Sequence, residues 1–213
     1  LSAIELYNND AVSLLKSFNK NYPESIYRNN INFRLGKFYY YKKKWVDALA
    51  WFEMLNVQDV QKEDRAEYFF KVGYANFKET NFDVARNAFV EIKDDTSQYA
   101  APAMYYYSHI AYQKEKYAVA LEGFLKLESH EKFGGFVPYY IAQIYYFSED
   151  YKQLVNYVEP MISTVVNSRK LELNRILGES YYRLRDYANA LKYLQVYHSE
   201  ATSISQTDFF MFA

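Results

Sequence analysis

Few residues in this sequence have the types and spacing that catalysis or metal binding requires. A metal site needs several ligating side chains close together, but the three histidines, His109, His130 and His198, lie far apart in the sequence, and there is no cysteine. The absence of cysteine also excludes disulfides and thiol chemistry, although it does not indicate a cellular compartment. The sequence therefore predicts no metal site and no cofactor.

Carboxylates and glycines that could serve in an active site have simpler explanations. Acidic pairs occur at Glu63-Asp64, Asp94-Asp95 and Glu149-Asp150, where we expect helix starts and turns, and carboxylates there are ordinary caps. The Phe-Gly-Gly-Phe segment at 133–136 lacks the preceding strand and the Lys-Ser/Thr pair of a phosphate-binding loop. Pro138 suits the first turn of a following helix. Because no nucleophile lies beside a base, we predict that the chain is not an enzyme.

The residues that do recur form a ladder of five rungs. Each rung has a small residue, an aromatic residue nine positions later, usually Ala three after that, and a bulky apolar residue four further on. The rungs are Gly36/Trp45/Ala48/Phe52, Gly73/Phe82/Ala85/Phe89, Ser108/Tyr117/Ala120/Phe124, Ala142/Tyr151/Leu154/Val158 and Gly178/Tyr187/Ala190/Leu194. They start 37, 35, 34 and 36 residues apart, and a nearly constant period of this length indicates a stacked array of helical repeats.

The spacing inside a rung predicts two helices joined by a tight turn. Residues three and four apart share one face of a helix, so the aromatic, the Ala and the bulky residue form one buried stripe. The gap of nine contains a polar stretch, such as 42–44 or 79–81, which we interpret as the turn. Glycine inside a helix costs about 1 kcal/mol relative to alanine, so the mid-helix glycines need a close contact with the partner helix. We expect Gly36, Gly73 and Gly178 to meet the small Ala48, Ala85 and Ala190.

These positions resemble the tetratricopeptide (TPR) repeat along nearly the whole chain. When the small residue is numbered repeat position 8, the family pattern has a bulky residue at position 7, an aromatic at 11, Ala at 20 and Phe at 24. Position 20 is Ala in four of the five units. Position 7 is Leu35, Val72, Tyr107, Ile141 and Leu177. The chain departs from the family at position 11, where Asn76 and Ala111 replace the aromatic, and no complete unit has the frequent Pro at position 32.

The resemblance implies an all-α fold, an α-solenoid of TPR-like antiparallel helix pairs stacked into a right-handed superhelix. No Gly-, Ser- or Pro-rich linker divides the sequence, so we predict one solenoid over 1–213. Its expected parts are the second helix of a truncated repeat at 1–24, five repeats at 29–62, 66–99, 101–134, 135–168 and 171–204, and the start of a further truncated helix at 205–213.

Both ends of the chain are expected to lie inside a repeat. The apolar stretch 209–212 is unlike the polar outer face that usually closes an array. We interpret the chain as a fragment of a longer bacterial TPR protein. The alternative is a natural terminus that docks back on the fifth repeat.

The fourth unit is the most divergent of the five. Leu154 and Val158 replace its Ala and Phe, and Pro160 falls inside its expected second helix. A proline there removes a backbone hydrogen bond and clashes with the preceding turn. We therefore predict that this helix kinks or ends early, near Glu159.

Charge and hydropathy exclude several classes of partner. The 25 Lys and Arg nearly balance the 26 Asp and Glu, and there is no run of five like charges, so nucleic acid and anionic membranes are poor candidates. No apolar stretch approaches the roughly 18 residues of a membrane helix, and no transmembrane segment is expected in this fragment. A bias toward Tyr, Asn and Lys is typical of a low-GC bacterium. Because bacterial TPR proteins often serve the cell envelope, the location favoured is the periplasm.

The concave face of the predicted solenoid is rich in aromatic side chains. In the TPR family, positions 2, 5, 9, 12 and 13 of the first helices point toward that face. Positions 5 and 12 supply nine aromatic residues out of ten: Phe33, Phe70, Tyr105, Tyr139, Tyr40, Phe77, Tyr112, Tyr146 and Tyr182, with Arg175 as the tenth. Tyrosine is enriched at binding sites because it combines a large, rigid face with a hydroxyl that hydrogen-bonds. The predicted contact residues are Phe33, Lys37, Tyr40, Phe70, Tyr74, Phe77, Tyr105, His109, Tyr112, Tyr139, Gln143 and Tyr146.

The predicted function is that of a non-catalytic scaffold that binds a protein or peptide in this groove. Some TPR proteins hold a C-terminal carboxylate with Asn at position 9, but none of the five units has Asn there, so a ligand with apolar or aromatic anchors fits better. One alternative is a rigid spacer or self-assembly segment, in which the rings at positions 5 and 12 would nearly all be buried. The other is carbohydrate binding by aromatic stacking, although Trp45 and Trp51 do not both face the groove.

Overall fold

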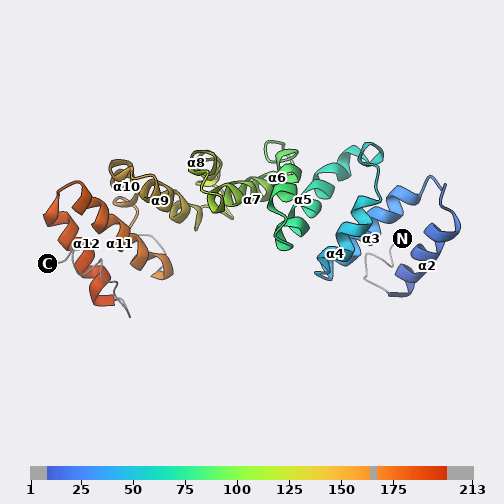
Figure 1. Cartoon of the computed structure of the whole chain (residues 1–213), viewed down its shortest axis with the longest axis horizontal. Coiled ribbons are helices and arrows are strands. Elements are labelled where there is room, and N and C mark those ends of the chain that lie inside the picture. Colours follow the sequence, from blue (N-terminus) through green and yellow to red (C-terminus); the bar gives the residue numbers. More distant parts are fainter. Residues whose placement is uncertain (1–8, 164–166, 201–213) are drawn as a thin grey trace. The chain divides into compact units, whose positions relative to one another are not determined.

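The computed structural model describes residues 9–163 and 167–200 (Figure 1). Within these ranges every regular element is a helix and there is no strand, which confirms the predicted all-α fold. The chain forms two compact units, Leu1–Ile110 and Ala111–Ala213, and each is described by itself. The start of the truncated repeat at 1–24 and the whole of the truncated helix at 205–213 lie outside the described residues. The single solenoid and its repeat boundaries stay a prediction.

The first unit is built from helices that run back and forth. They are α2 (Asn9–Asn21), α3 (Arg28–Tyr41), α4 (Trp45–Glu53), the short 3-10 helix η1 (Val57–Asp59), α5 (Lys62–Lys78), α6 (Phe82–Val90) and α7 (Ala100–Gln113), which continues into the second unit. α3 packs on α4 and α5 packs on α6, so each first helix lies against the second helix of its own repeat. α4 also packs on α5, which joins one pair to the next.

The second unit repeats this arrangement. Its further helices are α8 (Tyr117–Leu127), α9 (Val137–Phe147), α10 (Tyr151–Val158), α11 (Asn167–Arg183) and α12 (Tyr187–Glu200). α9 packs on α10, α11 packs on α12, and α10 packs on α11. α10 ends at Val158, with Glu159 as its C-cap. The early end predicted from Pro160 is therefore confirmed.

Buried glycines let the two helices of a pair approach closely. The contacts are Gly36 with Phe52, Gly73 with Phe89 and Gly178 with Leu194. At Gly73, an added Cβ would lie 2.6 Å from Cε1 of Phe89. The predicted close contact is confirmed. The atoms nearest to each glycine belong to the bulky residue at position 24 and not to the expected Ala48, Ala85 or Ala190.

All five turns inside the helix pairs have the same backbone structure. One residue in each has a φ between 56° and 64°, and none of them is glycine: Lys43, Thr80, Glu115, Glu149 and Arg185. In the second repeat, Thr80 N donates to Phe77 O (3.1 Å) and Asn81 N donates to Asn76 O (2.8 Å). Equivalent bonds occur in the other four turns. This is the Schellman arrangement, which satisfies the last carbonyl groups of a helix.

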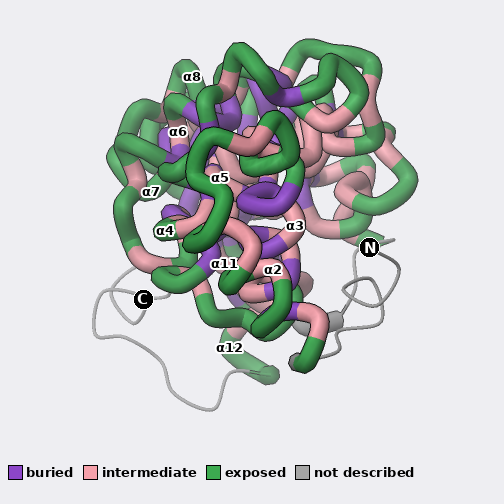
Figure 2. The backbone as a smooth tube through the Cα atoms, turned by 90° about the vertical axis from the view of Figure 1, so that its right-hand side faces the viewer, coloured by how far each residue is buried: buried purple, intermediate pink, exposed green. Residues whose placement is uncertain are grey.

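The core of each unit lies between the helices of a pair and between neighbouring pairs. In the first unit, Phe52 of α4 packs with Phe33 and Tyr68. In the second unit, Leu154 and Leu173 belong to one buried cluster. Figure 2 shows exposed turns and shorter buried stretches within the helices. Full burial of one such side chain stabilises the fold by about 1.5 to 3 kcal/mol.

Candidate functional site

The predicted groove residues lie on the first helices of the repeats. These are α3, α5 and most of α7 in the first unit, and the end of α7, α9 and α11 in the second. Among the nine rings at positions 5 and 12, Phe33 is buried, with 4% of its surface exposed. Tyr182 is 36% exposed and the other seven are half-buried. A half-buried ring packs on its neighbours with part of its surface and leaves the rest to solvent.

In the first unit, Glu67 of α5 lies between two lysines. Its Oε2 is 3.3 Å from Nζ of Lys37 on α3, and its Oε1 is 3.5 Å from Nζ of Lys71, one turn further along α5. Nζ of Lys37 also lies 4.6 Å from the centroid of the Phe33 ring. The carboxylate therefore fixes the predicted contact residue Lys37 against the neighbouring repeat.

Lys71 is buried at this place, with 4% of its surface exposed. Its Nζ donates a hydrogen bond to the Tyr41 hydroxyl (3.1 Å) and lies 4.3 Å and 4.2 Å from the ring centroids of Tyr40 and Tyr41. Burial lowers the pKa of Lys71, and Glu67 partly offsets this because a nearby anion favours the charged form. Two ring faces, a hydroxyl and a carboxylate thus replace the water that a buried ammonium loses.

Aromatic rings continue from this lysine along the first unit. The rings of Tyr40, Trp45 and Tyr74 lie 5.3 to 5.9 Å apart, centroid to centroid, in edge-to-face contacts. Tyr74 also contacts Tyr106 of α7 at 5.1 Å. Burial raises the pKa of Tyr40 and of Tyr106 well above the usual value. Both phenols are therefore neutral across the physiological range, and the cluster is an uncharged surface.

The α7 end of this surface is also uncharged. The rings of Phe77 and Tyr105 each lie 5.8 Å from the imidazole of His109, and burial lowers the pKa of His109. Phe70 stacks on Tyr99 at 5.3 Å, and burial raises the pKa of Tyr99 to about 12. The imidazole and the phenol are thus both neutral at pH 7.

In the second unit, three predicted contact residues form a chain of hydrogen bonds. The Tyr112 hydroxyl donates to Oε1 of Gln143 (3.0 Å), and Nε2 of Gln143 donates to the Tyr139 hydroxyl (2.9 Å). The guanidinium of Arg169 lies 4.3 Å from the centroid of the Tyr139 ring. Burial raises the pKa of Tyr112 to about 12. These bonds orient the Gln143 amide between the two rings.

A charged cluster follows on α11. Arg175 makes two hydrogen bonds to Glu172, Nη2 to Oε1 (2.7 Å) and Nε to Oε2 (3.0 Å), and it also pairs with Glu179. Glu179 is 5% exposed and accepts a hydrogen bond from the Tyr146 hydroxyl. The bond with Glu172 raises the pKa of Arg175, and burial raises the pKa of Tyr146 to about 12. The buried carboxylate of Glu179 is thus both paired and hydrogen-bonded, as a buried charge requires.

The chemistry offered by both surfaces consists of ring faces, hydroxyl groups and paired charges. Within residues 9–163 and 167–200, no group of three or more His, Asp or Glu side chains is placed to hold a metal ion. None of the described helices is both long enough and apolar enough to cross a membrane. The arrangement is suited to recognition of another molecule by packing and hydrogen bonding.

Some residues that build these surfaces were outside the sequence prediction. Glu67 and Lys71 could have been found, because opposite charges four residues apart pair on a helix. Tyr99, Tyr106 and Arg169 do not occupy positions 5, 9 or 12 of a repeat, so the repeat pattern carried no signal for them. Their contribution comes from neighbouring helices that bring them to the same rings.

Comparison with known proteins places the architecture among helical repeats. No protein-family model matches the chain, and no curated protein matches it either. A solved structure of MamA AMB-1 overlaps with a TM-score of 0.64 at 11% identity, covering 82% of this chain and 99% of MamA. The apo form of RapI overlaps with a TM-score of 0.63 at 19% identity, covering 96% of this chain and 62% of RapI. Both are TPR-like helical-repeat solenoids.

The chain has a tetratricopeptide-like fold. At these identities the likeness concerns the fold alone. The tetratricopeptide-like fold explains why helices that carry the ladder alternate in length and role, with α3, α5 and α11 each packing on a shorter second helix. It also explains why the candidate contact residues occur at regular intervals along the sequence.

Proposed function

We propose that this chain is a non-catalytic scaffold that binds a protein or peptide along the aromatic surface of its first helices. The observation that supports this most is the partial exposure of the rings at positions 5 and 12, of which Phe33 alone is buried. Rings that served only as core would be removed from water, and contiguous apolar surface left in water marks interaction sites. The TPR-like fold supports the same proposal, since such folds commonly act as interaction scaffolds.

The chemistry of the two surfaces suggests the kind of ligand. In the first unit, neutral rings around Tyr74 and Phe77 would accept apolar or aromatic side chains. In the second unit, Gln143 and the Tyr112 hydroxyl add polar contacts that can fix the register of a bound segment. We therefore propose a ligand with aromatic or aliphatic anchors separated by polar residues.

The partial exposure also distinguishes this proposal from its alternatives. A pure spacer would bury the rings at positions 5 and 12, and most of them retain surface in solvent. Carbohydrate binding usually needs an open tryptophan or tyrosine face, but Trp45 is half-buried with its ring against Tyr40 and Tyr74. Peptide binding requires only that ring edges and hydroxyls be reachable.

Selection of peptides from a random displayed library against the immobilised chain tests the proposal. The affinity of a selected peptide is then measured by fluorescence anisotropy for the chain and for a variant carrying Phe147→Ala and Tyr182→Ala, two exposed rings of the groove helices. We expect at least about tenfold weaker binding, because two lost contacts of more than about 1 kcal/mol each exceed the roughly 1.4 kcal/mol of a tenfold change.

Tyr22→Ala is the matched control, because Tyr22 is an exposed ring that follows α2 and contacts Phe18. Its affinity for the peptide should equal that of the unmodified chain, and all variants should melt alike. Failure to select any peptide, or equal binding by the groove variant, would refute the proposal and favour the spacer.

A further inference from the structure

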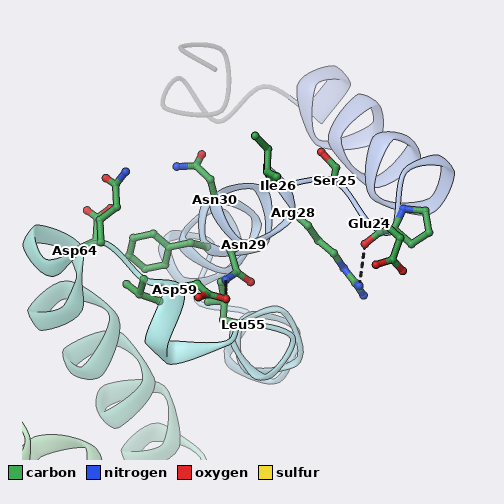
Figure 3. A pocket seen from close by; sticks show the side chains of 13 residues that line it. Glu24, Ser25, Ile26, Arg28, Asn29, Asn30, Leu55, Asp59 and Asp64 are labelled. Atoms are coloured by element: carbon green, nitrogen blue, oxygen red, sulfur yellow. Dashed lines mark hydrogen bonds between the residues drawn. The ribbon is translucent and has the colours of Figure 1, made fainter.

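A pocket of about 500 Å³ lies in the first unit, beside the N-terminal ends of α3 and α5 (Figure 3). Three apolar residues that line it, Phe33, Leu55 and Val60, are themselves buried. Asp59 and Asp64 also line it, but Figure 3 shows them apart from each other, so they do not converge on one point. A carboxylate on which two side chains do converge lies in the second unit, at the end of α10.

The Glu159 carboxylate holds two tyrosines of the second unit through its two oxygen atoms. The Tyr193 hydroxyl donates to Oε1 (2.7 Å), and the Tyr181 hydroxyl donates to Oε2 (2.8 Å). The Tyr193 oxygen also accepts a hydrogen bond from Nζ of Lys192 (3.2 Å). Both phenolic protons are therefore directed at one carboxylate, which is placed to accept either of them.

The two tyrosine rings are also stacked on each other. Their centroids lie 5.7 Å apart and their planes differ by 2°. Tyr181 and Tyr193 are 7% and 5% exposed, whereas Glu159 is half-buried and can exchange protons with water. Because the rings are parallel and share one carboxylate, their hydroxyl ends lie side by side, together with the ring carbons ortho to each hydroxyl.

We propose that Tyr181 and Tyr193 are a site of oxidative cross-linking, at which a carbon–carbon bond joins α11 to α12. The co-reactant is a small one-electron oxidant, such as the carbonate radical anion. A phenol gives up an electron more easily when its proton can leave at the same time, and Glu159 is placed to take that proton. The cross-link lies outside the proposed binding function and does not depend on it.

Formation of the bond removes two electrons and two protons from the pair. Each of two oxidant molecules takes one electron, and the phenolic protons pass one after the other to the Glu159 carboxylate and then to water. The two ring radicals couple through their ortho carbons. The hydrogen atoms on these carbons then move to the phenolic oxygens, which restores both hydroxyl groups. With the carbonate radical as oxidant, the products are one linked pair and two hydrogencarbonate ions.

Tyrosine is the favoured electron donor in the second unit. Residues 111–213 contain neither cysteine nor tryptophan, the other side chains that readily give up a single electron. A second tyrosine–glutamate contact in this unit lacks a stacked partner. There the Tyr157 hydroxyl donates to Glu128 (2.7 Å), but the Tyr145 ring meets Tyr157 edge to face, at 67°. The pair on Glu159 combines a base with parallel rings.

A limited dose of carbonate radicals followed by peptide mapping tests the proposal. The radicals are generated in dilute protein by photolysis of a cobalt(III) carbonato complex, and the monomer is isolated and digested with trypsin. The expected product joins the peptide 176–183, through Tyr181, to the peptide 193–213, through Tyr193. Tandem mass spectrometry locates the bond, and dityrosine fluorescence follows its formation.

Variants separate the roles of the three residues. Tyr181→Phe and Tyr193→Phe each keep the ring but remove a hydroxyl, and each should abolish the linked product. Glu159→Gln keeps an acceptor oxygen but is not a base, so most of the product should be lost while the rings still stack. Thermal unfolding before treatment shows that each variant is folded.

The matched control is a pair of exposed tyrosines in the same two helices. Tyr182 and Tyr187 are 36% and 60% exposed, and their ring centroids lie 5.6 Å apart, but their planes differ by 65°. A bond between them would join the peptides 176–183 and 186–192. We expect much less of this product than of the one formed by the buried pair.

Three results would overturn the proposal. The first is absence of the Tyr181–Tyr193 bond at a dose that oxidises other tyrosines. The second is an equal yield of that bond in Glu159→Gln, because the carboxylate would then have no part in its formation. The third is an equal or higher yield of the Tyr182–Tyr187 bond, because exposure alone would then decide which rings are linked.

Discussion

At the scale of single residues, the carboxylate of Glu159 joins two tyrosines of the second unit. It accepts hydrogen bonds from the hydroxyls of Tyr193 (2.7 Å) and Tyr181 (2.8 Å), whose rings stack at 5.7 Å with an interplanar angle of 2°. These bonds, first that of Tyr193 and then that of Tyr181, lower the pKa of Glu159. A similar contact joins the Tyr157 hydroxyl to Glu128 (2.7 Å). Tyr193 of α12 thus donates to Glu159 at the end of α10, and Tyr157 of α10 donates to Glu128 at the end of α8. In both cases the second helix of one pair is joined to the second helix of the preceding pair.

Replacement of Glu159 should therefore destabilise the second unit. Glu159→Ala leaves two buried hydroxyls without an acceptor, at a cost of about 1 to 3 kcal/mol in the free energy of unfolding. Glu159→Gln retains an acceptor oxygen and should cost less. Urea unfolding followed by circular dichroism measures both, and equal stability of all three proteins would contradict this role of Glu159.

The same carboxylate predicts a pH dependence with a definite sign. Because its pKa is lowered in the folded state, its stabilising contribution is complete above the ordinary pKa of 4.5 and is lost as pH falls through the folded-state pKa. The stability difference between the unmodified chain and Glu159→Gln should therefore shrink below about pH 4.5. A difference that grows on acidification would show that the sign is wrong.

At the scale of the elements, all five helix pairs share a Schellman turn, and three of them also have a close glycine contact. The turns are notable because lysine, threonine, glutamate and arginine occupy the left-handed position that glycine usually takes. The turn hydrogen bonds are present in all five pairs, so packing of the two helices sustains a conformation that the side chains disfavour.

Thr80 is the most strained of these residues, because it is β-branched and has a φ of 62°. Thr80→Gly should raise the free energy of unfolding by about 0.5 to 1 kcal/mol, since relief of about 1 to 2 kcal/mol of left-handed strain outweighs the added backbone entropy. Glu79→Gly, one residue earlier at a φ of −87°, is the control and should destabilise. Thermal unfolding compares the two, and loss of stability in Thr80→Gly would refute the interpretation.

Gly73→Ala should destabilise the second repeat even though alanine favours helices. The new methyl would overlap the Phe89 ring, and overpacking of this kind costs about 1 to 3 kcal/mol. Phe89→Leu should partly rescue it, which a double-mutant cycle would detect as a coupling energy. At Gly135 an added Cβ meets no atom within 4 Å, so Gly135→Ala is the control. Absence of coupling between positions 73 and 89 would exclude this contact.

At the scale of the whole molecule, the chain consists of two compact units, and each contains a buried cluster. Phe52 and Phe33 belong to a cluster in the first, and Leu154 and Leu173 to a cluster in the second. Within each unit, helices of one pair contact the next pair along the chain, which is the condition for nearest-neighbour cooperativity. Damage to one core should therefore spread only over nearby helices.

Leu173→Ala tests this expectation. Leu173 is fully buried, and its truncation should cost about 2 to 5 kcal/mol. Hydrogen exchange followed by mass spectrometry should then show faster exchange in α9 to α12 and almost unchanged protection in α3 to α6. Equal acceleration in both groups of helices would mean that the chain unfolds as a single cooperative unit.

Local rules made part of this structure predictable. The early end of α10 followed from Pro160, and the close glycine contacts followed from the cost of glycine inside a helix. The partner of Gly73 did not, because the reach of Phe89 across a helix pair depends on side-chain length in three dimensions. The pocket lined by Asp59 and Asp64 was also beyond prediction, since it is built by connecting segments and helix starts that follow no repeat pattern.

The five left-handed turn residues also make the chain a convenient object for spectroscopy. Each is exposed, and the backbone bonds of the turn do not depend on which side chain it carries. The chain has no cysteine, so a single cysteine introduced at 43, 80, 115, 149 or 185 would be the sole attachment point for a fluorophore or spin label. With labels at two of these positions, the distance between the labelled turns could be measured with and without a ligand.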